Sequence, residues 1–444
     1  MKVMKFGGTS VGSPERIKHV ATLIQTDAPT FVVLSAMSGT TNTLVEIAGY
    51  LYNRNPDGAS ETINRLEAIY NRHIAQLYST DKWKENTRSC LCEVFDSLRA
   101  FTRQPFGLGE EKQLLAQGEI MSTNMMTNYL HEQGVPAVLL SALDFMRLTG
   151  SGEPDLAFIK EKLGEQLQAT ANTPLYITQG FICRNAYGEV DNLQRGGSDY
   201  TASLVGAAIE AEEIQIWTDI DGMHNNDPRI VDGTEAVRHL HFEEAAELAY
   251  FGAKILHPTC IQPAKYANIP VRLLNTMEPQ APGTLIDNRR DTGSIKAVAA
   301  KDNITAIRIK SSRMLLAHGF LRKVFEIFES WHTSIDMICT SEVGVSMSID
   351  DTRHLGEIVH DLKKYGTVSV DLDMCIVCVV GDMDWENVGF ETRAMQALKD
   401  IPVRMVSYGG SNYNISFLVR EEDKPRALRA LSACLFNKGL EMKD

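Results

Sequence analysis

Short apolar segments alternate with amphipathic segments through roughly the first 290 residues of the chain, and this alternation then stops. Each apolar segment has the length of a buried strand. Alternation of this kind predicts an α/β fold with a mostly parallel sheet sandwiched by helices. Ligands of such sheets bind beyond the carboxyl ends of the strands. The predicted strands are Val3–Phe6, Phe31–Ser35, Ala137–Leu140, Leu175–Gln179, Ile214–Thr218 and Val271–Leu274.

Helices are predicted between these strands by apolar residues at i, i+3, i+4 and i+7. Ser13 suits a helix N-cap, and Pro14 suits the first helical position. The apolar positions that follow are Ile17, Val20, Ala21 and Ile24, and the same spacing recurs at Leu44, Ile47, Ala48 and Leu51.

The pattern changes after a segment rich in Pro, Gly and charge, Glu278–Ser294. Strict alternation of apolar and polar residues then predicts strands around Val345 and Ile415. The two halves of this region match at an offset of about 70 residues, as at Gly319-Phe320 and Gly389-Phe390. We therefore expect a domain at 1–290 and two interleaved α+β modules at 300–370 and 371–444. Duplicated modules commonly pair through their sheets, which favours an oligomer.

Charge and cysteine content exclude several classes of protein. The net charge of −13 argues against a nucleic-acid or anionic-membrane surface. The sequence contains no run of 18 apolar residues, so no membrane span is predicted. The first predicted strand starts so near the N-terminus that we expect no targeting segment before it. The eight scattered cysteines are typical of reduced thiols in a cytoplasm. Cys375 and Cys378 form a CxxC, but that spacing on a buried strand puts their side chains on opposite faces, which disfavours a redox or metal site.

Two loops of similar composition could hold an anion. In "KFGGTS", Lys5 ends a strand, Gly7 and Gly8 let a ligand approach the backbone, and Ser10 adds a donor. The alternative is a strand that runs into a tight turn. In "QRGGSD", the planar guanidinium of Arg195 suits a carboxylate or phosphate. Asp199 lies in the first turn of the helix that follows, and its only role could be a favourable interaction with the dipole of that helix.

Three further positions carry polar groups of interest. Asp221-Gly222, in "WTDIDG", makes a turn that could serve only to break the chain. Lys254, in "FGAKILHP", would on its own be a solvated surface lysine. Glu119, in "GEIMS", lies on a partly apolar helix face, where its carboxylate needs an internal cation or a ligand ammonium.

Taken together, these motifs resemble the aspartokinase family of the amino acid kinase superfamily over nearly the whole chain. The carrying motifs are "KFGGTSV" (5–11), "GEIMS" (118–122), "ITQGFI" (177–182), "GGSDYTA" (196–202), "WTDIDG" (217–222), "DPR" (227–229) and "FGAKILHP" (251–258). By resemblance, 1–290 is the amino acid kinase domain and the repeat is a tandem pair of ferredoxin-like ACT modules. "MLLAHGFL" and "SIDMICTSEVGVS" most resemble the lysine-sensitive monofunctional class.

The resemblance implies phosphorylation of L-aspartate by ATP to 4-phospho-L-aspartate, the first step toward lysine, threonine and methionine. It implies Mg²⁺, held mainly by phosphate oxygens and water, with no protein ligand assigned. It also implies a homodimer through the ACT modules, or a tetramer, with lysine as inhibitor. The side-chain carboxylate of aspartate is ionised at neutral pH, so positioning and charge neutralisation suffice without a general base.

Matching positions imply a role for each site residue. Lys5 contacts the transferring phosphoryl group, and Asp199 holds Lys5. The phosphate loop has Gly7, Gly8 and Ser10; the substrate contacts are Thr41, Glu119 (α-ammonium), Arg195 (α-carboxylate) and Ser198; the ATP contacts are Thr218, Asp219, His224, Arg229 and Lys254. The effector contacts are Met314, Gly319, Phe320, Leu321, Ser334, Asp336, Ser341 and Glu342.

The sequence departs from the family pattern at two positions. His224 stands where tyrosine is common near the base, and Ala317 stands where the lysine-sensitive pattern often has serine. The loss of one hydroxyl contact leaves the strength of lysine inhibition open. Asp336 and Glu342 suit a cationic amino acid, and the alternative for either is a solvated charge at a strand end.

The residues by themselves are also compatible with two other functions. One is another amino acid kinase, acting on glutamate, acetylglutamate or a nucleotide; Glu119 and Arg195 together favour a free α-amino acid. The other is a catalytically silent ACT sensor, which the presence of every charged catalytic position disfavours.

Overall fold

The computed structural model describes residues 1–171, 173–193, 196–252, 257–311 and 318–436. Four residues singled out above, Arg195, Lys254, Met314 and Ala317, lie outside this part of the chain. The chain forms two compact units. The first comprises Met1–Met223 and Ile255–Asn288, and the second comprises His224–Lys254 and Arg289–Asp444.

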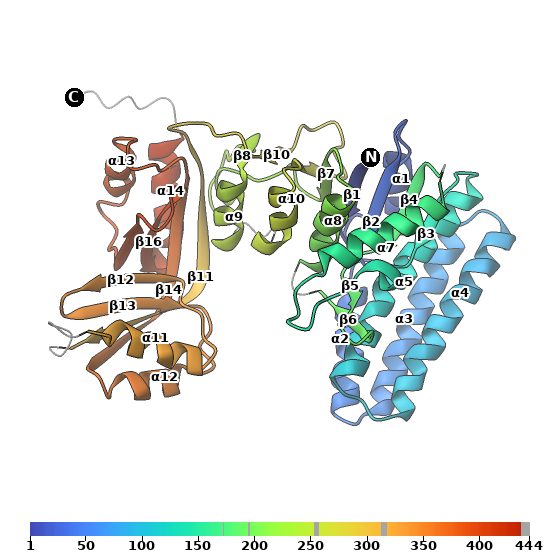
Figure 1. The fold of residues 1–444 in the computed structure, drawn as a ribbon, viewed down its shortest axis with the longest axis horizontal. Coiled ribbons are helices and arrows are strands. Elements are labelled where there is room, and N and C mark those ends of the chain that lie inside the picture. The colour runs from blue at the N-terminus through green and yellow to red at the C-terminus, as the bar shows by residue number, and fades with distance from the viewer. Residues whose placement is uncertain (172, 194–195, 253–256, 312–317, 437–444) are drawn as a thin grey trace. The chain divides into compact units, whose positions relative to one another are not determined.

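A mostly parallel sheet forms the centre of the first unit, as predicted (Figure 1). Its strands follow the order β3–β4–β2–β1–β7–β9–β10, and β10 pairs antiparallel with β9. All six predicted strands are confirmed to within one residue at each end. The strands of this unit are β1 (Lys2–Phe6), β2 (Thr30–Leu34), β3 (Val138–Leu140), β4 (Leu175–Gln179), β5 (Ile182–Arg184), β6 (Val190–Asn192), β7 (Ile214–Thr218), β9 (Val271–Asn275) and β10 (Thr284–Asp287).

Helices cover this sheet, and the three longest, α3, α4 and α5, run alongside one another (Figure 1). The predicted N-cap is confirmed, because the Arg16 N–H donates to Ser13 Oγ at 3.3 Å. The helices are α1 (Pro14–Leu23), α2 (Thr40–Tyr52), α3 (Pro56–Leu77), α4 (Asp81–Ala100), η1 (Phe101–Arg103), α5 (Leu108–Glu132), α6 (Ala142–Phe145), α7 (Leu156–Ala169), α8 (Gly197–Ala208), η2 (Pro258–Ile261) and α10 (Gln262–Tyr266).

An antiparallel sheet organises the second unit, in the order β12–β13–β11–β14–β16–β15. The two long central strands serve both modules: Ile295 of β11 pairs with Gly381 of β14, and Lys310 pairs with Thr367. One apolar core lies under α11 and α12, and another under α13 and α14. The elements are β8 (His239–His241), α9 (Phe242–Tyr250), β11 (Ile295–Lys310), α11 (Phe320–Ser330), β12 (Met337–Ser341), β13 (Gly344–Ile349), α12 (Leu355–Leu362), β14 (Thr367–Gly381), α13 (Phe390–Ala397), β15 (Met405–Tyr408), β16 (Asn414–Arg420), η4 (Glu421–Asp423) and α14 (Lys424–Leu435).

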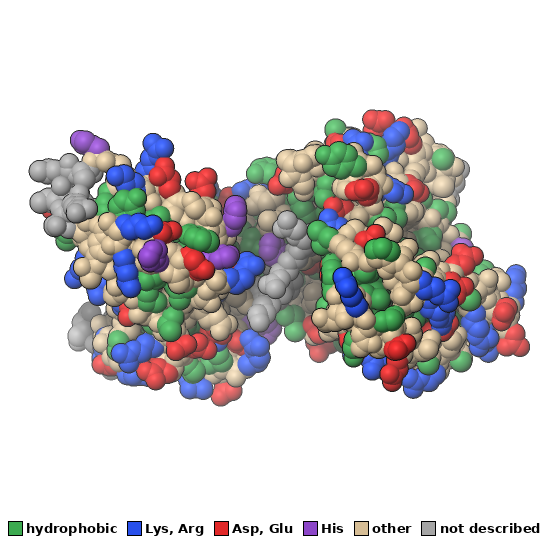
Figure 2. All heavy atoms as spheres, turned by 90° about the horizontal axis from the view of Figure 1, so that it is seen from below, with side chains coloured by type: hydrophobic (Ala, Val, Ile, Leu, Met, Phe, Trp, Pro, Cys, Tyr) green, Lys and Arg blue, Asp and Glu red, His purple; other side chains and the backbone are tan. Residues whose placement is uncertain are grey.

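Lys and Arg alternate with Asp and Glu over the face drawn in Figure 2, where the described side chains form no continuous basic area. Among the described helices, none is long and apolar enough to cross a membrane. Cys375 and Cys378 are both buried within β14 and unpaired.

Candidate active site

Lys5 and Asp199 form a largely buried ion pair at the carboxyl end of the parallel sheet. Lys5 lies near the end of β1, and Asp199 lies in the first turn of α8. Lys5 Nζ is 2.7 Å from Asp199 Oδ1, and the two side chains are 10% and 13% exposed. Interior charges are tolerated when they are paired, so each residue compensates the charge of the other and orients it. A Cβ added to Gly7 would lie 3.6 Å from Lys5 Nζ, so the glycine keeps the approach to this ammonium open.

The segment that follows β2 lies against both the glycine loop and α5. The Ala36 N–H donates to Glu119 Oε1 at 3.1 Å, and Ser122 Oγ donates to the Ser35 carbonyl at 2.8 Å. A Cβ at Gly8 would lie only 2.8 Å from the Ala36 carbonyl oxygen. Only a residue without a side chain fits here, and the glycine loop, the end of β2 and Glu119 are thereby brought together.

Burial raises the pKa of the Glu119 carboxyl to about 7, against the opposing effects of the Ala36 N–H and of Lys5. Among the described residues, no Lys or Arg forms an ion pair with Glu119. The alternative of an internal cationic partner therefore finds no support in this part of the chain. A buried carboxyl that titrates near neutral pH is typical of a functional site.

The first turn of α8 lies against the end of β4. A Cβ at Gly180 would lie 2.5 Å from Ser198 Cβ, and the Phe181 N–H donates to Thr201 Oγ1 at 3.0 Å. Gly196, the N-cap residue just before α8, has a φ of +78°, a left-handed conformation that favours glycine. Cys260 Sγ donates to the Gly196 carbonyl at 3.3 Å. These contacts hold Ser198 and Asp199 at the same end of the sheet as Lys5.

One long-range network was not predicted from the sequence. Ser10 Oγ lies 2.7 Å from Thr276 Oγ1, just beyond the end of β9, and His19 Nε2 lies 2.7 Å from the Thr276 carbonyl oxygen. The network fixes the far side of the glycine loop. No sequence signal could have found it, because 266 residues separate Ser10 from Thr276.

The predicted ATP residues are divided between the two units. Thr218 ends β7, where its carbonyl accepts from the Thr276 N–H at 2.8 Å, and Asp219 is exposed beside it. His224 and Arg229 belong to the second unit. His224 Nδ1 lies 3.1 Å from Thr234 Oγ1, and Arg229 is 78% exposed with its guanidinium on Asp227.

The other predicted contacts include exposed and buried residues. Thr41 is exposed on α2, whereas its neighbour Thr40 is buried and lies 2.8 Å from the Tyr70 hydroxyl. Of the described effector residues, Phe320 and the side chain of Asp336 are buried, Gly319 begins α11, and the rest are partly or fully exposed: Leu321, Ser334, Ser341 and Glu342.

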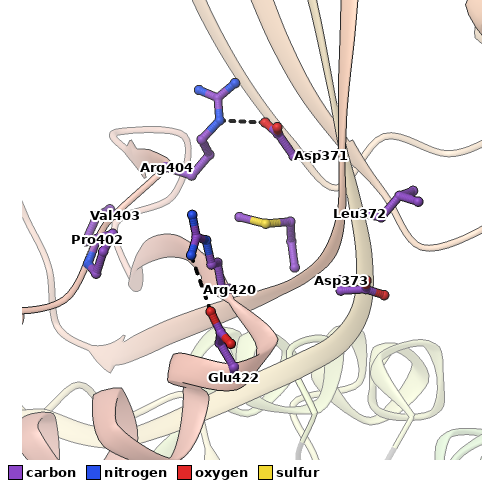
Figure 3. Close-up of a pocket in the computed structure, with 9 residues that line it drawn as sticks. Asp371, Leu372, Asp373, Pro402, Val403, Arg404, Arg420 and Glu422 are labelled. Carbon is purple, nitrogen blue, oxygen red and sulfur yellow. Dashed lines mark hydrogen bonds and ion pairs between the residues drawn. The ribbon is translucent and has the colours of Figure 1, made fainter.

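A cavity of about 590 Å³ lies elsewhere, in the second unit, where β14 changes register (Figure 3). Arg404 Nε donates to Asp371 Oδ2 at 2.7 Å, and an Arg420 nitrogen donates to Glu422 at 3.3 Å. Four of its lining charges form these two ion pairs, and it contains none of the residues predicted to take part in phosphoryl transfer.

A cage of protein ligands for a metal is not present in the described ranges, where no cluster of three His, Cys, Asp or Glu side chains could hold an ion. Mg²⁺ commonly binds through one or two carboxylates plus substrate phosphates. Asp199 supplies one carboxylate beside Lys5, and a single carboxylate fits this mode of binding.

Comparison with known proteins finds matches over nearly the whole chain. A model of the amino acid kinase family matches residues 1–275, and an ACT domain model matches 377–435. The chain is 34% identical to lysine-sensitive aspartokinase 3 of Escherichia coli, over 98% of this chain and 99% of that protein. It is 36% identical to chloroplastic aspartokinase 1 of Arabidopsis thaliana, over 98% of this chain and 80% of that protein.

Two solved structures have the same fold. The crystal structure of E. coli aspartokinase III with aspartate and ADP (R-state) matches with a TM-score of 0.85 at 33% identity, covering 98% of this chain and all of that one. The T-state structure with lysine and aspartate matches with a TM-score of 0.80 at 33% identity, over 98% and 99% of the two chains.

Proposed function

Because the chain belongs to the aspartokinase family of amino acid kinases, we infer that it transfers the γ-phosphoryl group of ATP to the side-chain carboxylate of L-aspartate. The products are ADP and 4-phospho-L-aspartate. The observation that carries the mechanism is the buried Lys5–Asp199 ion pair next to the glycine loop. The acceptor is already an anion, so the enzyme has to bring two anions together and neutralise their charge.

In this proposal Lys5 contacts the transferring phosphoryl group. The phosphates are bound by the backbone N–H groups of Gly7 and Gly8 and by the Ser10 hydroxyl. Asp199 compensates the charge of Lys5 and directs its ammonium at this position, which the 2.7 Å separation supports. Mg²⁺ would be held mainly by nucleotide oxygens and water near Asp199, and it would neutralise charge between the phosphates. Thr218, Asp219, His224, Arg229 and Lys254 are the proposed contacts for the rest of ATP.

Glu119 binds the α-ammonium of aspartate in this proposal, and Arg195 binds its α-carboxylate, assisted by Thr41 and Ser198. The buried, hydrogen-bonded position of Glu119 supports its role, because a substrate ammonium would compensate the carboxylate that burial disfavours.

A pH profile tests the role of Glu119. Since the pKa of its carboxyl is about 7, we expect kcat/KM for aspartate to fall about tenfold per pH unit below 7 and to level off above it. Protonated Glu119 cannot pair with an ammonium, whereas the ionised form can. In Glu119→Gln we expect a lower profile without this inflection; an inflection that persists in the variant would assign the titration to another group.

Lysine is the proposed inhibitor, at Gly319, Phe320, Leu321, Ser334, Asp336, Ser341, Glu342 and Met314. A homodimer through the ACT modules is also proposed, supported by the exposed apolar side chains of Leu321 and Phe325 on α11 and of Ile338 on β12. A reducing compartment such as the cytoplasm is proposed from the cysteines, which are unpaired in the described part of the chain.

The purified protein with ATP and Mg²⁺ should form an acyl phosphate that hydroxylamine traps, and only when aspartate is present. Glutamate and acetylglutamate at equal concentration serve as alternative acceptors. Faster phosphorylation of either would replace aspartate as the substrate, and no ADP release with any acceptor would show a silent sensor. Lysine, threonine and methionine are then added at millimolar concentration to identify the effector.

A further inference from the structure

A cluster of charged groups lies in the second unit, apart from the proposed catalytic residues. Its centre is Asp336, which directly precedes β12 and whose side chain is 1% exposed. The Tyr250 hydroxyl donates to Asp336 Oδ1 at 2.8 Å, and Lys301 Nζ lies 2.8 Å from the same oxygen. Lys301 Nζ also lies 2.9 Å from Asp350 Oδ2 and 4.4 Å from the centre of the Tyr250 ring.

The second oxygen of Asp336 is not satisfied. Asp336 Oδ2 is buried and accepts no hydrogen bond from any residue that the structure describes. Burial raises the pKa of the Asp336 carboxyl even though Lys301 lies beside it. A buried carboxylate oxygen without a donor is costly, so Asp336 retains the capacity to bind a further cationic donor.

Lys301 can give up its contact with Asp336 and still keep a carboxylate partner for its ammonium charge. Its side chain is only 18% exposed, but Asp350, its second partner, is 42% exposed. Lys301 Nζ already lies 2.9 Å from Asp350 Oδ2, so this ion pair can persist when the ammonium gives up its contact with Asp336. A primary ammonium from outside could then take the same place, because it is chemically the same group as Lys301 Nζ.

We propose that Lys301 and Tyr250 are positioning residues of the effector site: Lys301 occupies the place on Asp336 that the side-chain ammonium of a bound basic amino acid takes, and Tyr250 transmits the exchange to α9. The inference rests on the proposed function, which places Asp336 among the lysine contacts. It adds that the protein carries its own competitor for the effector, and that competition selects ligands with a free primary ammonium.

The path to catalysis runs through α9. Tyr250 is the last residue of this helix, and Lys254, a proposed ATP contact, follows shortly after it in the chain. A ligand ammonium that takes the place of Lys301 on Asp336 Oδ1 competes with the Tyr250 hydroxyl for the same oxygen, so the end of α9 loses a tether. An effector acts only through such a difference in contacts between two states.

The first test measures lysine binding by calorimetry on the full chain. Lys301→Met removes the competing ammonium, so we expect L-lysine to bind about tenfold more tightly than to the wild type. Lys310→Met, at the exposed end of the same strand, should leave the affinity unchanged, and Lys301→Arg should keep it near or below the wild-type value. Unchanged or weaker binding to Lys301→Met would overturn the competition.

The second test separates binding from inhibition and applies even if Lys301→Met does not fold. Tyr250→Phe should bind lysine at least as tightly as the wild type. Its aspartate kinase activity without lysine should already be lowered, and added lysine should change it by less than about twofold. Tyr408→Phe, which removes a phenol bonded to the Met383 carbonyl in the same unit, should be inhibited like the wild type. A wild-type inhibition curve in Tyr250→Phe would overturn the role of Tyr250.

The wild type distinguishes this inference from the proposed reaction. If it phosphorylates aspartate but binds no lysine, the competition at Asp336 is overturned and the reaction stands. If it binds lysine with the predicted changes in the variants but forms no acyl phosphate, the exchange stands and the proposed reaction fails.

Discussion

Replacing Lys5 with Met is expected to lower kcat/KM for the phosphorylation of aspartate by roughly 10³-fold, with the fold retained. The variant keeps an apolar stem of similar length, so packing around the end of β1 changes little, but the charge that we propose to face the γ-phosphoryl group is lost. The loss should fall mainly on kcat, because the charge is needed most when negative charge is shared among the attacking, transferring and leaving oxygens.

Initial rates with saturating ATP and Mg²⁺ measure this effect, and a thermal melt checks the fold. Lys2→Met is the matched control, since Lys2 lies at the opposite, amino end of the same strand. It should have wild-type activity. A Lys5→Met enzyme within tenfold of the wild type would remove Lys5 from the mechanism.

The strands and the position of the site were predictable from the sequence for one physical reason. A parallel strand is buried on both faces, so it appears as a short apolar run, and its carboxyl end is where chemistry-bearing residues follow. Lys5, Thr218 and the region of Ser35 each come at such an end, and the structure brings the first and last together with Glu119 and Asp199.

Other features could not be read from local patterns. The contact of Ser10 with Thr276 and the thiol of Cys260 on Gly196 join segments that are far apart in the chain, and only the tertiary fold creates them. Arg404 likewise has a carboxylate partner, Asp371, that lies 33 residues away and that no motif reveals. The burial of Glu119, which raises its pKa, likewise depends on how α5 packs against the end of β2.

Removing Asp199 should damage stability as well as catalysis. In Asp199→Ala the Lys5 ammonium stays largely buried without a counter-ion, which is expected to lower the free energy of unfolding by about 3–5 kcal/mol. Activity should fall by roughly 10²-fold or more, because the Lys5 ammonium is no longer held in position by its partner. Chemical denaturation at pH 7, together with the same rate assay, measures both effects.

The double variant Lys5→Met/Asp199→Ala separates the two roles of the pair. An apolar side chain in place of the buried ammonium needs no counter-ion, so most of the lost stability should return, whereas activity should stay at the level of Lys5→Met. Glu210→Ala, which breaks the exposed ion pair with Lys160, should alter stability little. If the double variant were as unstable as Asp199→Ala, the carboxylate would be stabilising α8 or the glycine loop directly and not through Lys5. If it recovered activity along with stability, the ion pair would be a structural element and phosphoryl transfer would depend on other cations.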